Sequence, residues 1–378
     1  MRENGTSLRQ NGAGPRQNGA GARQKSARSA PQCRGARCGY SIPGIWLLSG
    51  RRPGAGAGVP GPGSAVTPVT PVTTVAPPGV GLVGLYWTLA GPVQVKTGRE
   101  WSLFDFQDRC EEAARAGFRG IGLWHADLEH VLVTRTLGEM KQILAGNGLE
   151  YLELEFLTDW FIDSGDGRRR AADARRRLLL EASGVLDAHH IKVGNLTGTP
   201  CAAGKITEEF AGLCAEAAQH TAAKIVYEFM PFDANVRSVA QALAVVAGAG
   251  ADNGGIAIDT WHLGKLRIPP GDLGQIPPRF LSWIELSDGQ VADMPDLSDE
   301  TLNHRRLPGE GELGVDRYVA AGQDLGYEGP WGVEVLSAEL RNLPMGEMYR
   351  RAYQATAAQF RPGPATPAGC GASTREGA

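Results

Sequence analysis

Cysteine, histidine and long hydrophobic runs are scarce in this sequence of 378 residues, and each scarcity excludes a class of protein. The six cysteines are scattered and form no Cys-x-x-Cys pair, so no disulfide framework is expected, and a reducing compartment, the cytoplasm, is predicted. No stretch approaches the roughly 20 apolar residues that a membrane span needs, so no membrane partner is expected. The composition of the whole sequence, 42% hydrophobic and 21% charged, is typical of a globular protein.

Acidic residues are almost absent from the first 77 positions, which carry ten Lys and Arg residues against one Glu. That segment therefore has a net charge of +9, and the rest of the chain must carry −12 to give the overall −3. An acidic body argues against a nucleic-acid partner, because a basic surface supplies most of the affinity for nucleic acid.

The same N-terminal segment has a composition that disfavours folding. It contains two copies of Arg-Gln-Asn-Gly-Ala-Gly and then a long stretch of mostly Gly, Pro, Ala, Val, Ser and Thr. Such a segment buries too little apolar surface to offset the entropy of ordering its backbone. We therefore expect residues 1–78 to form a disordered basic tail and residues 362–378 a disordered C-terminal tail.

Between these tails, over residues 79–361, short apolar runs alternate with amphipathic segments. This alternation predicts parallel strands joined by helices. Eight such strands fit a closed (β/α)₈ TIM barrel, which usually needs about 250 residues. A doubly wound open sheet is the weaker alternative, because no GxGxxG follows the first strand. The expected strands are 82–88, 120–124, 151–156, 190–193, 224–229, 255–259, 281–286 and 331–336, and the expected helices are 104–116, 137–144, 168–183, 208–221, 238–247 and 345–360.

Ionisable side chains lie near the carboxyl ends of most of these strands, where TIM barrels carry their active sites. A carboxylate inside an apolar strand is costly unless it is paired, hydrogen-bonded or bound to a metal. Acids on four consecutive strands would point at one axis, where they must share protons or a cation. Oxygen ligands favour Mg²⁺, Mn²⁺ or a similar ion. The four acids are Glu228, Asp259, Glu285 and Glu334, and His125 and Lys192 also lie at strand ends.

Other strand-end residues are interpreted as structural. Glu155, taken alone, is more simply a core acid satisfied by a salt bridge. Trp87, Trp124, Phe156 and Trp160 are expected to pack in the core, with stacking on a sugar as the alternative.

Five short segments between residues 226 and 334 carry a family resemblance. They are Val226-Tyr-Glu-Phe-Met-Pro231, Asp259-Thr-Trp-His262, Glu285 followed by Asp288, Pro308-Gly-Glu-Gly311, and Gly326-Tyr-Glu-Gly-Pro-Trp-Gly-Val-Glu334. As an ordered set they resemble the sugar phosphate isomerase/epimerase group of xylose isomerase-like barrels. The resemblance covers about residues 79–361, and its Asp-x-x-His and Pro-Gly-x-Gly elements are fairly specific together.

The resemblance implies roles for individual residues. It implies that Glu228, Asp259, Glu285 and Glu334 hold the metal and that Glu228 and Glu334 also carry protons. It places His262 and a basic residue after the seventh strand on the substrate. For the latter, the segment His304-Arg305-Arg306 supplies candidates, of which Arg306 is the one expected. Lys192 and His125 are expected to contact the substrate as well.

One position departs from the family pattern, in which the strand-seven ligand is commonly His. This chain has Glu285 there, and four carboxylates around one divalent ion would leave excess negative charge. Proton uptake by one of them, or a nearby cation such as Lys192 or Arg306, would offset that excess. The alternative is that Glu285 is not a ligand.

The resemblance implies a metal-dependent isomerase or epimerase that acts on a sugar, keto-sugar or sugar phosphate through an enediolate. Mn²⁺ is the expected ion, with Mg²⁺ or Co²⁺ as alternatives. The same residues would also serve a dehydratase of the inosose or 3-dehydroshikimate kind, and a non-catalytic sugar-binding barrel is a further alternative. An abasic-site endonuclease is disfavoured by the seven histidines and the acidic body. The expected partner is a small sugar or cyclitol, and a homo-oligomer is left open.

Overall fold

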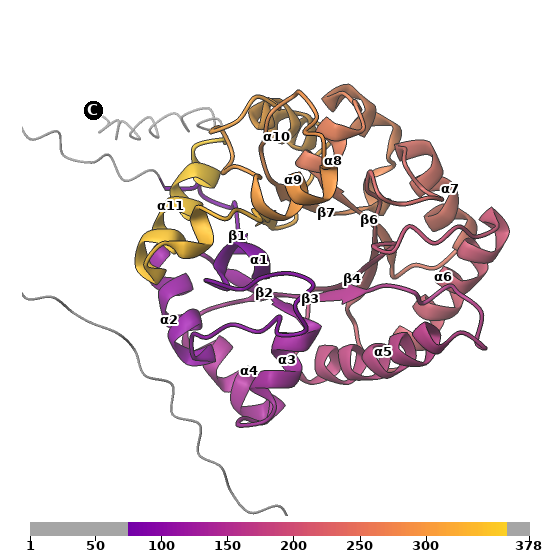
Figure 1. The fold of residues 1–378 in the computed structure, drawn as a ribbon, viewed down its shortest axis with the longest axis horizontal. Helices are drawn as coiled ribbons and strands as arrows, with labels where there is room; N and C mark the ends of the chain where they lie inside the picture. The colour runs from indigo at the N-terminus through magenta and orange to yellow at the C-terminus, as the bar shows by residue number, and fades with distance from the viewer. Residues whose placement is uncertain (1–74, 361–378) are drawn as a thin grey trace, which may run out of the picture. The chain divides into compact units, whose positions relative to one another are not determined.

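The computed structural model describes residues 75–360. Eight parallel strands form a closed barrel in which each strand pairs with the next and the eighth returns to pair with the first (Figure 1). The predicted TIM barrel is therefore confirmed. The predicted tails fall outside the described residues, apart from positions 75–78. The strands are β1 Leu82–Gly84, β2 Gly120–Trp124, β3 Tyr151–Leu157, β4 His190–Gly194, β5 Lys224–Glu228, β6 Gly254–Asp259, β7 Leu281–Leu286 and β8 Trp331–Val333.

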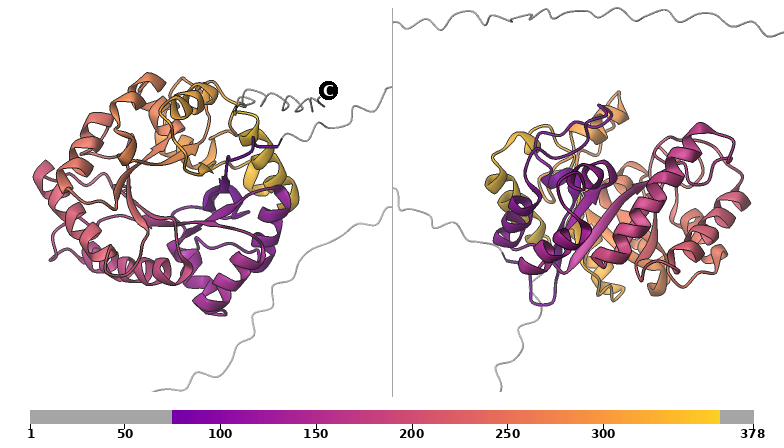
Figure 2. Two further views of the ribbon diagram at one scale, coloured as in Figure 1. Left: turned by 180° about the vertical axis from the view of Figure 1, so that it is seen from behind. Right: turned by 90° about the horizontal axis from the view of Figure 1, so that it is seen from below.

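Helices surround the strands as a continuous ring, which is also seen from behind (Figure 2). None of the helices within residues 75–360 is long and apolar enough to cross a membrane. The helices are α1 Tyr86–Leu89, α2 Phe106–Ala116, α3 His125–Val131, α4 Leu137–Gly146, α5 Gly167–Leu186, α6 Ala203–Ala217, α7 Val239–Ala249, α8 Thr260–Lys265, α9 Leu297–Asn303, α10 Val315–Asp324 and α11 Met345–Ala357, with short 3₁₀ turns at Pro270–Gln275, Pro278–Phe280 and Leu340–Asn342.

The first strand is shorter than the sequence predicts. β1 ends at Gly84, and the following residues form the short helix α1, so the expected strand 82–88 is wrong beyond Gly84. All four residues of α1 are buried, and an apolar run of this length does not by itself distinguish strand from helix. Thr88 replaces part of the missing ladder: its hydroxyl donates to the Val333 carbonyl at 2.8 Å and accepts from the Val335 amide at 2.7 Å.

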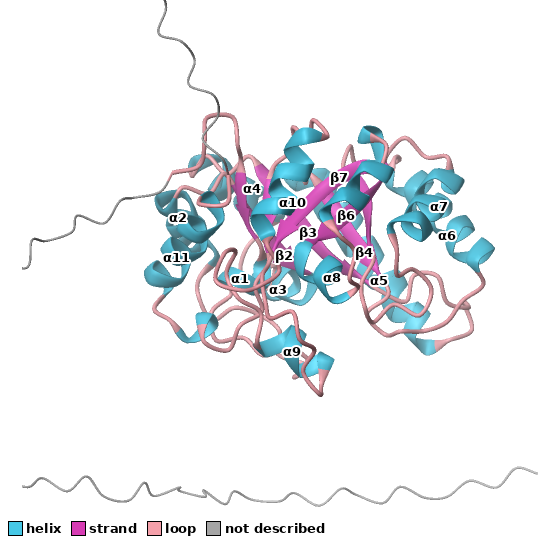
Figure 3. Ribbon diagram, turned by 90° about the horizontal axis from the view of Figure 1, so that it is seen from above, coloured by secondary structure: helices cyan, strands magenta, loops and turns pink. Residues whose placement is uncertain are grey.

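Short helices that follow strand ends lie on one side of the barrel. In Figure 3, α1, α3, α8 and α9 lie along the lower side of the molecule. None of these was predicted, because four to seven residues are too few to show helical periodicity. α10 was also missed, although its buried residues Val315, Tyr318 and Val319 have helical spacing.

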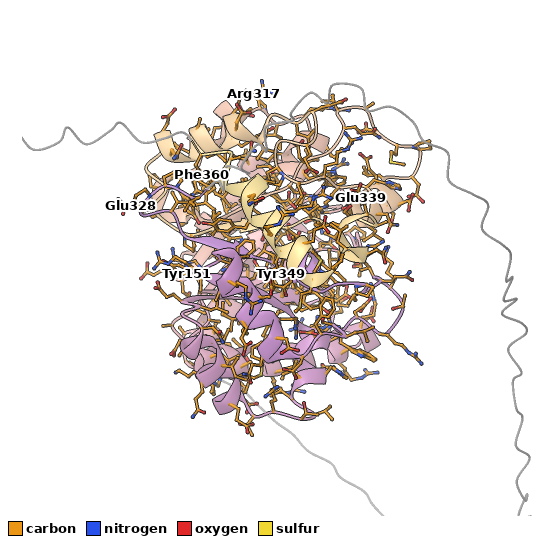
Figure 4. The ribbon with its side chains drawn as sticks, turned by 90° about the vertical axis from the view of Figure 1, so that its left-hand side faces the viewer. Tyr151, Arg317, Glu328, Glu339, Tyr349 and Phe360 are labelled. Carbon is orange, nitrogen blue, oxygen red and sulfur yellow. The ribbon has the colours of Figure 1, made fainter. Side chains whose placement is uncertain are left out.

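The last helix closes the ring beside the first ones. In Figure 4, α11 in yellow lies against the N-terminal part of the barrel in purple, and Tyr349 is labelled between them. The Tyr349 hydroxyl donates to the Leu89 carbonyl at 3.2 Å, which ties α11 to α1.

Successive residues of a strand alternate between the two faces of the sheet. Two residues that are two positions apart on a strand therefore share a face. Three such pairs are Glu153 with Glu155 on β3, His190 with Lys192 on β4, and Trp283 with Glu285 on β7.

Candidate metal and substrate site

The ammonium group of Lys192, on β4, lies within a group of buried carboxylates. Its Nζ atom is 2.7 Å from Glu285 Oε1, 3.0 Å from Glu334 Oε1 and 3.1 Å from Glu155 Oε2. Burial alone would lower the pKa of Lys192, but the surrounding carboxylates raise it well above its usual value. Lys192 is therefore a fixed positive charge. Two further carboxylate oxygens lie at 3.6 and 4.0 Å, on Glu153 and Glu228.

The acids around this ammonium differ in their ionisation. Burial raises the pKa of Glu155 well above its usual value, and the neighbouring acids add to that effect while Lys192 opposes it. Burial would also raise the pKa of Glu153, but Lys192 and His190 hold it below its usual value. His190 Nε2 lies 2.8 Å from Glu153 Oε2. Lys192 and His190 therefore favour the ionised form of Glu153, whereas burial favours the protonated form of Glu155.

The four acids named from the sequence meet at the carboxyl ends of β5, β6, β7 and β8. Each offers one oxygen, and these four oxygens all lie within 4.8 Å of one another. Two buried oxygens of these residues, Glu228 Oε1 and Glu285 Oε2, accept no hydrogen bond among the described residues, and His262 Nε2 lies 3.2 Å from the first of them. Unpartnered buried oxygens at this spacing fit the donor set of a hard divalent cation. The acids are Glu228, Asp259, Glu285 and Glu334.

Asp259 and His262 are positioned by the start of α8. Asp259 caps this helix, since its Oδ1 accepts from the Trp261 amide at 2.7 Å, and its Oδ2 is left to face the site. One turn along the helix, His262 Nε2 lies 3.2 Å from Glu228 Oε1 and 3.6 Å from Asp259 Oδ2. The Asp-x-x-His spacing thus brings both side chains to one point.

Arg305, rather than Arg306, is the arginine that reaches the site. Its Nη1 donates to Asp259 Oδ2 at 2.6 Å and lies 3.6 Å from Glu334 Oε2, and its guanidinium carbon is 4.6 Å from the centre of the Trp261 ring. Arg305 is buried, and Thr301 accepts two further hydrogen bonds from it.

Arg306, which the sequence analysis placed on the substrate, faces the other way. Its side chain is exposed, donates to the Glu310 carbonyl at 3.3 Å and lines a separate cavity of about 530 Å³. Its backbone pairs with Asp288 as a bridge, and neighbouring residues of an extended segment point to opposite sides. The sequence contains both arginines but no signal for which of them faces inward.

His125 is also outside the pocket. The ring is buried against Trp124, with ring centres 4.5 Å apart, and it is not among the residues that line the cavity above the carboxylates. Burial lowers the pKa of His125 to about 3, with a smaller contribution from Arg175. The structure therefore places His125 in a packing environment outside the lining of this cavity.

A cavity of about 340 Å³ opens above the carboxylates. Its floor includes Glu155, Glu228, His262, Arg305 and Glu334. An apolar part of its wall is formed by Trp87, Trp124, Phe156, Met230, Phe232 and Leu336, and the polar residues Lys96, Glu100, Thr197 and Ser298 also line it.

The aromatic residues of this wall both pack and line the cavity. Trp87 and Trp124 meet edge to face with ring centres 5.0 Å apart, and Phe156 belongs to the same buried cluster. The expectation of core packing is confirmed for Trp160, which packs against Phe161 with ring centres 5.3 Å apart. For Trp87, Trp124 and Phe156 the expectation of core packing is incomplete, because these side chains also line the cavity.

The Pro308-Gly-Glu-Gly311 segment folds around Asp288. Asp288 Oδ2 accepts from the amides of Gly309 and Gly311 at 3.0 and 3.1 Å. A side chain at position 311 would not fit, since a Cβ atom there would lie 2.3 Å from Asp288 Oδ1. This part of the motif therefore shapes the loop that carries Arg305 and does not itself reach the cavity.

Comparison with known proteins identifies similar barrels. A family model described as a xylose isomerase-like TIM barrel matches residues 110–358. The chain is 24% identical over 242 residues to a 3-dehydroshikimate dehydratase of Pseudomonas aeruginosa, a match that covers 63% of this chain and 37% of the dehydratase. It is 22% identical over 240 residues to an inosose isomerase of Halalkalibacterium halodurans, covering 61% of this chain and 82% of the isomerase.

A solved structure shares the fold. It is a crystal structure of a protein called IOLI with a bound zinc atom, which matches with a TM-score of 0.62 and 18% identity over 74% of this chain and 98% of that one. An identity this low shows a common architecture and nothing finer. The chain also spans little more than a third of the length of the dehydratase that it matches.

Proposed function

The chain belongs to the xylose isomerase-like TIM-barrel family, and from this premise we propose that it is a divalent-metal-dependent isomerase or epimerase of a small sugar or keto-sugar. In this proposal Glu228, Asp259, Glu285 and Glu334 hold the metal, and Glu228 and Glu334 transfer protons. Mn²⁺ or Mg²⁺ is the proposed ion. A cytoplasmic location and homo-oligomerisation stay predictions.

One observation carries the proposal: two of the four clustered acids face the cavity. Glu228 and Glu334 line it, whereas Asp259 and Glu285 do not. Glu228 ends β5 and Glu334 follows β8, so these two acids approach the cavity from different parts of the barrel. Two carboxylates that approach a substrate from different sides are suited to remove a proton at one carbon and return it elsewhere.

The chemistry divides between the ion and the side chains. A bound divalent ion would polarise a substrate carbonyl and stabilise the charge that develops on its oxygen. Glu228 or Glu334 takes the proton beside the carbonyl, and the other returns it. His262 and Arg305, which also line the cavity, supply hydrogen-bond donors for substrate oxygens, and the aromatic wall excludes water.

A dehydratase is the second candidate, and a specific observation favours it: the chain resembles a 3-dehydroshikimate dehydratase over 242 residues. One carboxylate would remove the proton beside the carbonyl, and the other, in its protonated form, would donate a proton to the β-hydroxyl, which then leaves as water instead of the substrate regaining a proton at carbon. The apolar wall of Trp87, Trp124 and Phe156 suits the flat, unsaturated ring that such a reaction produces.

A direct assay separates these functions. The full chain, loaded with Mn²⁺, is incubated with ketohexoses, inosose and 3-dehydroshikimate, and products are separated by chromatography. An isomeric sugar or inosose product supports the proposal, and an unsaturated product with new ultraviolet absorbance supports the dehydratase. Binding without conversion of any compound contradicts both and supports a non-catalytic sugar-binding barrel.

Arg305 and Arg306 offer a matched pair of substitutions for the same assay. We expect Arg305→Met to lower kcat/KM by roughly 10²–10³-fold, because it removes a buried donor from the cavity and leaves Asp259 without its partner. Arg306→Met removes the same charge from an exposed side chain and should leave kcat/KM unchanged. Equal losses in the two variants would show that Arg305 has no special position.

A further inference from the structure

Glu285 is held by one of its carboxylate oxygens and leaves the other one unpartnered. Oε1 accepts from Lys192 Nζ at 2.7 Å and from the indole Nε1 of Trp283 at 2.7 Å. Oε2 is buried and has no hydrogen-bond partner among the described residues. Two donors on one oxygen fix the orientation of the carboxylate and leave Oε2 as the oxygen that is open to a further ligand.

Lys192 has no donor left for any other role. An ammonium group donates three hydrogen bonds, and three carboxylate oxygens lie within 3.1 Å of Nζ, on Glu285, Glu334 and Glu155. The acids Glu153, Glu155 and Glu334 form a group with metal-like spacing of their own, and the Lys192 ammonium already lies among them. The barrel therefore presents two adjacent cation positions, one of which is filled by its own side chain.

Within the group of four acids the charges balance, although Lys192 is shared with Glu153, whose Oε1 lies 3.6 Å from its Nζ. The four carboxylates of Glu228, Asp259, Glu285 and Glu334 carry four negative charges when ionised. A divalent ion supplies two positive charges, and Lys192 and Arg305 supply one each at 2.7 Å from Glu285 and 2.6 Å from Asp259. Glu153 lies outside this set and is hydrogen-bonded by His190. A fourth carboxylate is therefore tolerable because Lys192 accompanies it.

We propose that Glu285 is a metal ligand at the end of β7 and that Lys192, paired with it, offsets its negative charge. Together the two side chains have the net charge of one neutral imidazole, which would also complete the site. The pair gives the ion an all-carboxylate set, which favours Mn²⁺ or Mg²⁺ relative to Zn²⁺ more than a set containing an imidazole does. Lys192 is in this account a positioning residue, which acts through Glu285. The inference rests on the proposed function, since it assumes that the four acids bind a metal.

The test is a charge-matched swap in the full chain. Glu285→His and the double variant Lys192→Met/Glu285→His are stripped of metal and titrated with Mn²⁺ and with Zn²⁺ by calorimetry. Glu285→His keeps the positive charge of Lys192 but removes the carboxylate that it shares at 2.7 Å, so Mn²⁺ binding should weaken by roughly 10–100-fold. The double variant restores the balance of charge and should regain about tenfold or more of that loss. Its ratio of Mn²⁺ to Zn²⁺ affinity should move toward zinc by about tenfold.

The outcomes distinguish this inference from the proposed function. Equal Mn²⁺ affinities in the single and double variants would overturn the inference, because Lys192 would then not be coupled to Glu285. Failure of the unaltered protein to bind either ion would overturn the proposed function as well. If the histidine variants do not fold, the comparison of Glu285→Gln with Lys192→Met/Glu285→Gln decides, since Gln keeps the shape of the side chain and an oxygen for the Trp283 hydrogen bond.

Discussion

Replacing Glu228 or Glu334 by Gln is expected to lower kcat by roughly 10²–10⁴-fold, the range that a positioned proton carrier contributes. Both side chains line the cavity and belong to the group of four acids. Gln keeps the shape of each side chain but neither accepts a proton at neutral pH nor carries charge. The measurement is steady-state turnover of the compound that the unaltered protein converts, at saturating Mn²⁺, so that weaker metal binding does not imitate lost chemistry.

The fold should survive these substitutions. Glu228 and Glu334 lie among like charges, so removing one charge relieves repulsion, and the melting temperature of the metal-free protein should stay the same or rise. Glu208→Gln, on the exposed face of α6, is the matched control and should change neither quantity. Full turnover by either Glu228→Gln or Glu334→Gln at saturating metal would end the proton-transfer assignment.

Replacing Lys192 by Met is expected to cost about 3–5 kcal/mol of unfolding free energy at neutral pH, the usual effect of removing one partner from a buried ion pair. The ammonium is the cation closest to Glu285, and its loss leaves Glu285 and Glu334 without that partner. The measurement is denaturant unfolding of the metal-free protein. Lys141→Met breaks an exposed ion pair with Asp187 and should cost at most about 1 kcal/mol.

This loss should depend on pH in a defined direction. Burial raises the pKa of Glu155 and Glu285 well above the usual value, and Lys192 opposes that rise, so its removal raises both further. A carboxyl group whose pKa is higher in the folded state costs stability as pH rises from its unfolded pKa, about 4.3, through its folded pKa. The deficit of Lys192→Met should therefore shrink as pH falls toward 4.3. A deficit that is constant between pH 5 and 8 would contradict the role of Lys192 as a counter-ion.

Strand order and most strand positions followed from the sequence because the signals are local. Buried parallel strands such as β6 and β7 are mostly apolar, and an acid at or next to the last residue, Asp259 or Glu285, breaks the apolar pattern. Barrel closure then brings these acids together whatever the loops do. The grouping of the four acids could thus be predicted from strand ends alone.

Features that depend on loop geometry or on three-dimensional packing could not be predicted in the same way. Whether Arg305 or Arg306 faces the cavity depends on a bridge between Asp288 and Arg306, which local sequence does not encode. The aromatic residues Trp87, in α1, and Trp124, at the end of β2, are far apart in the sequence and form one surface only after closure. Lys192 was noticed at a strand end, but its contacts with five carboxylates required the closed barrel.

We propose that four carboxylates at the mouth of this barrel bind one divalent ion, and this binding can be measured directly. It is tested most directly by calorimetric titration of the metal-free full chain with Mn²⁺, repeated on Asp259→Asn, which removes charge from an acid that does not line the cavity. We expect about one ion per chain and a loss of roughly 10-fold or more in affinity for Asp259→Asn. No binding of Mn²⁺, or binding that Asp259→Asn leaves unchanged, would contradict it.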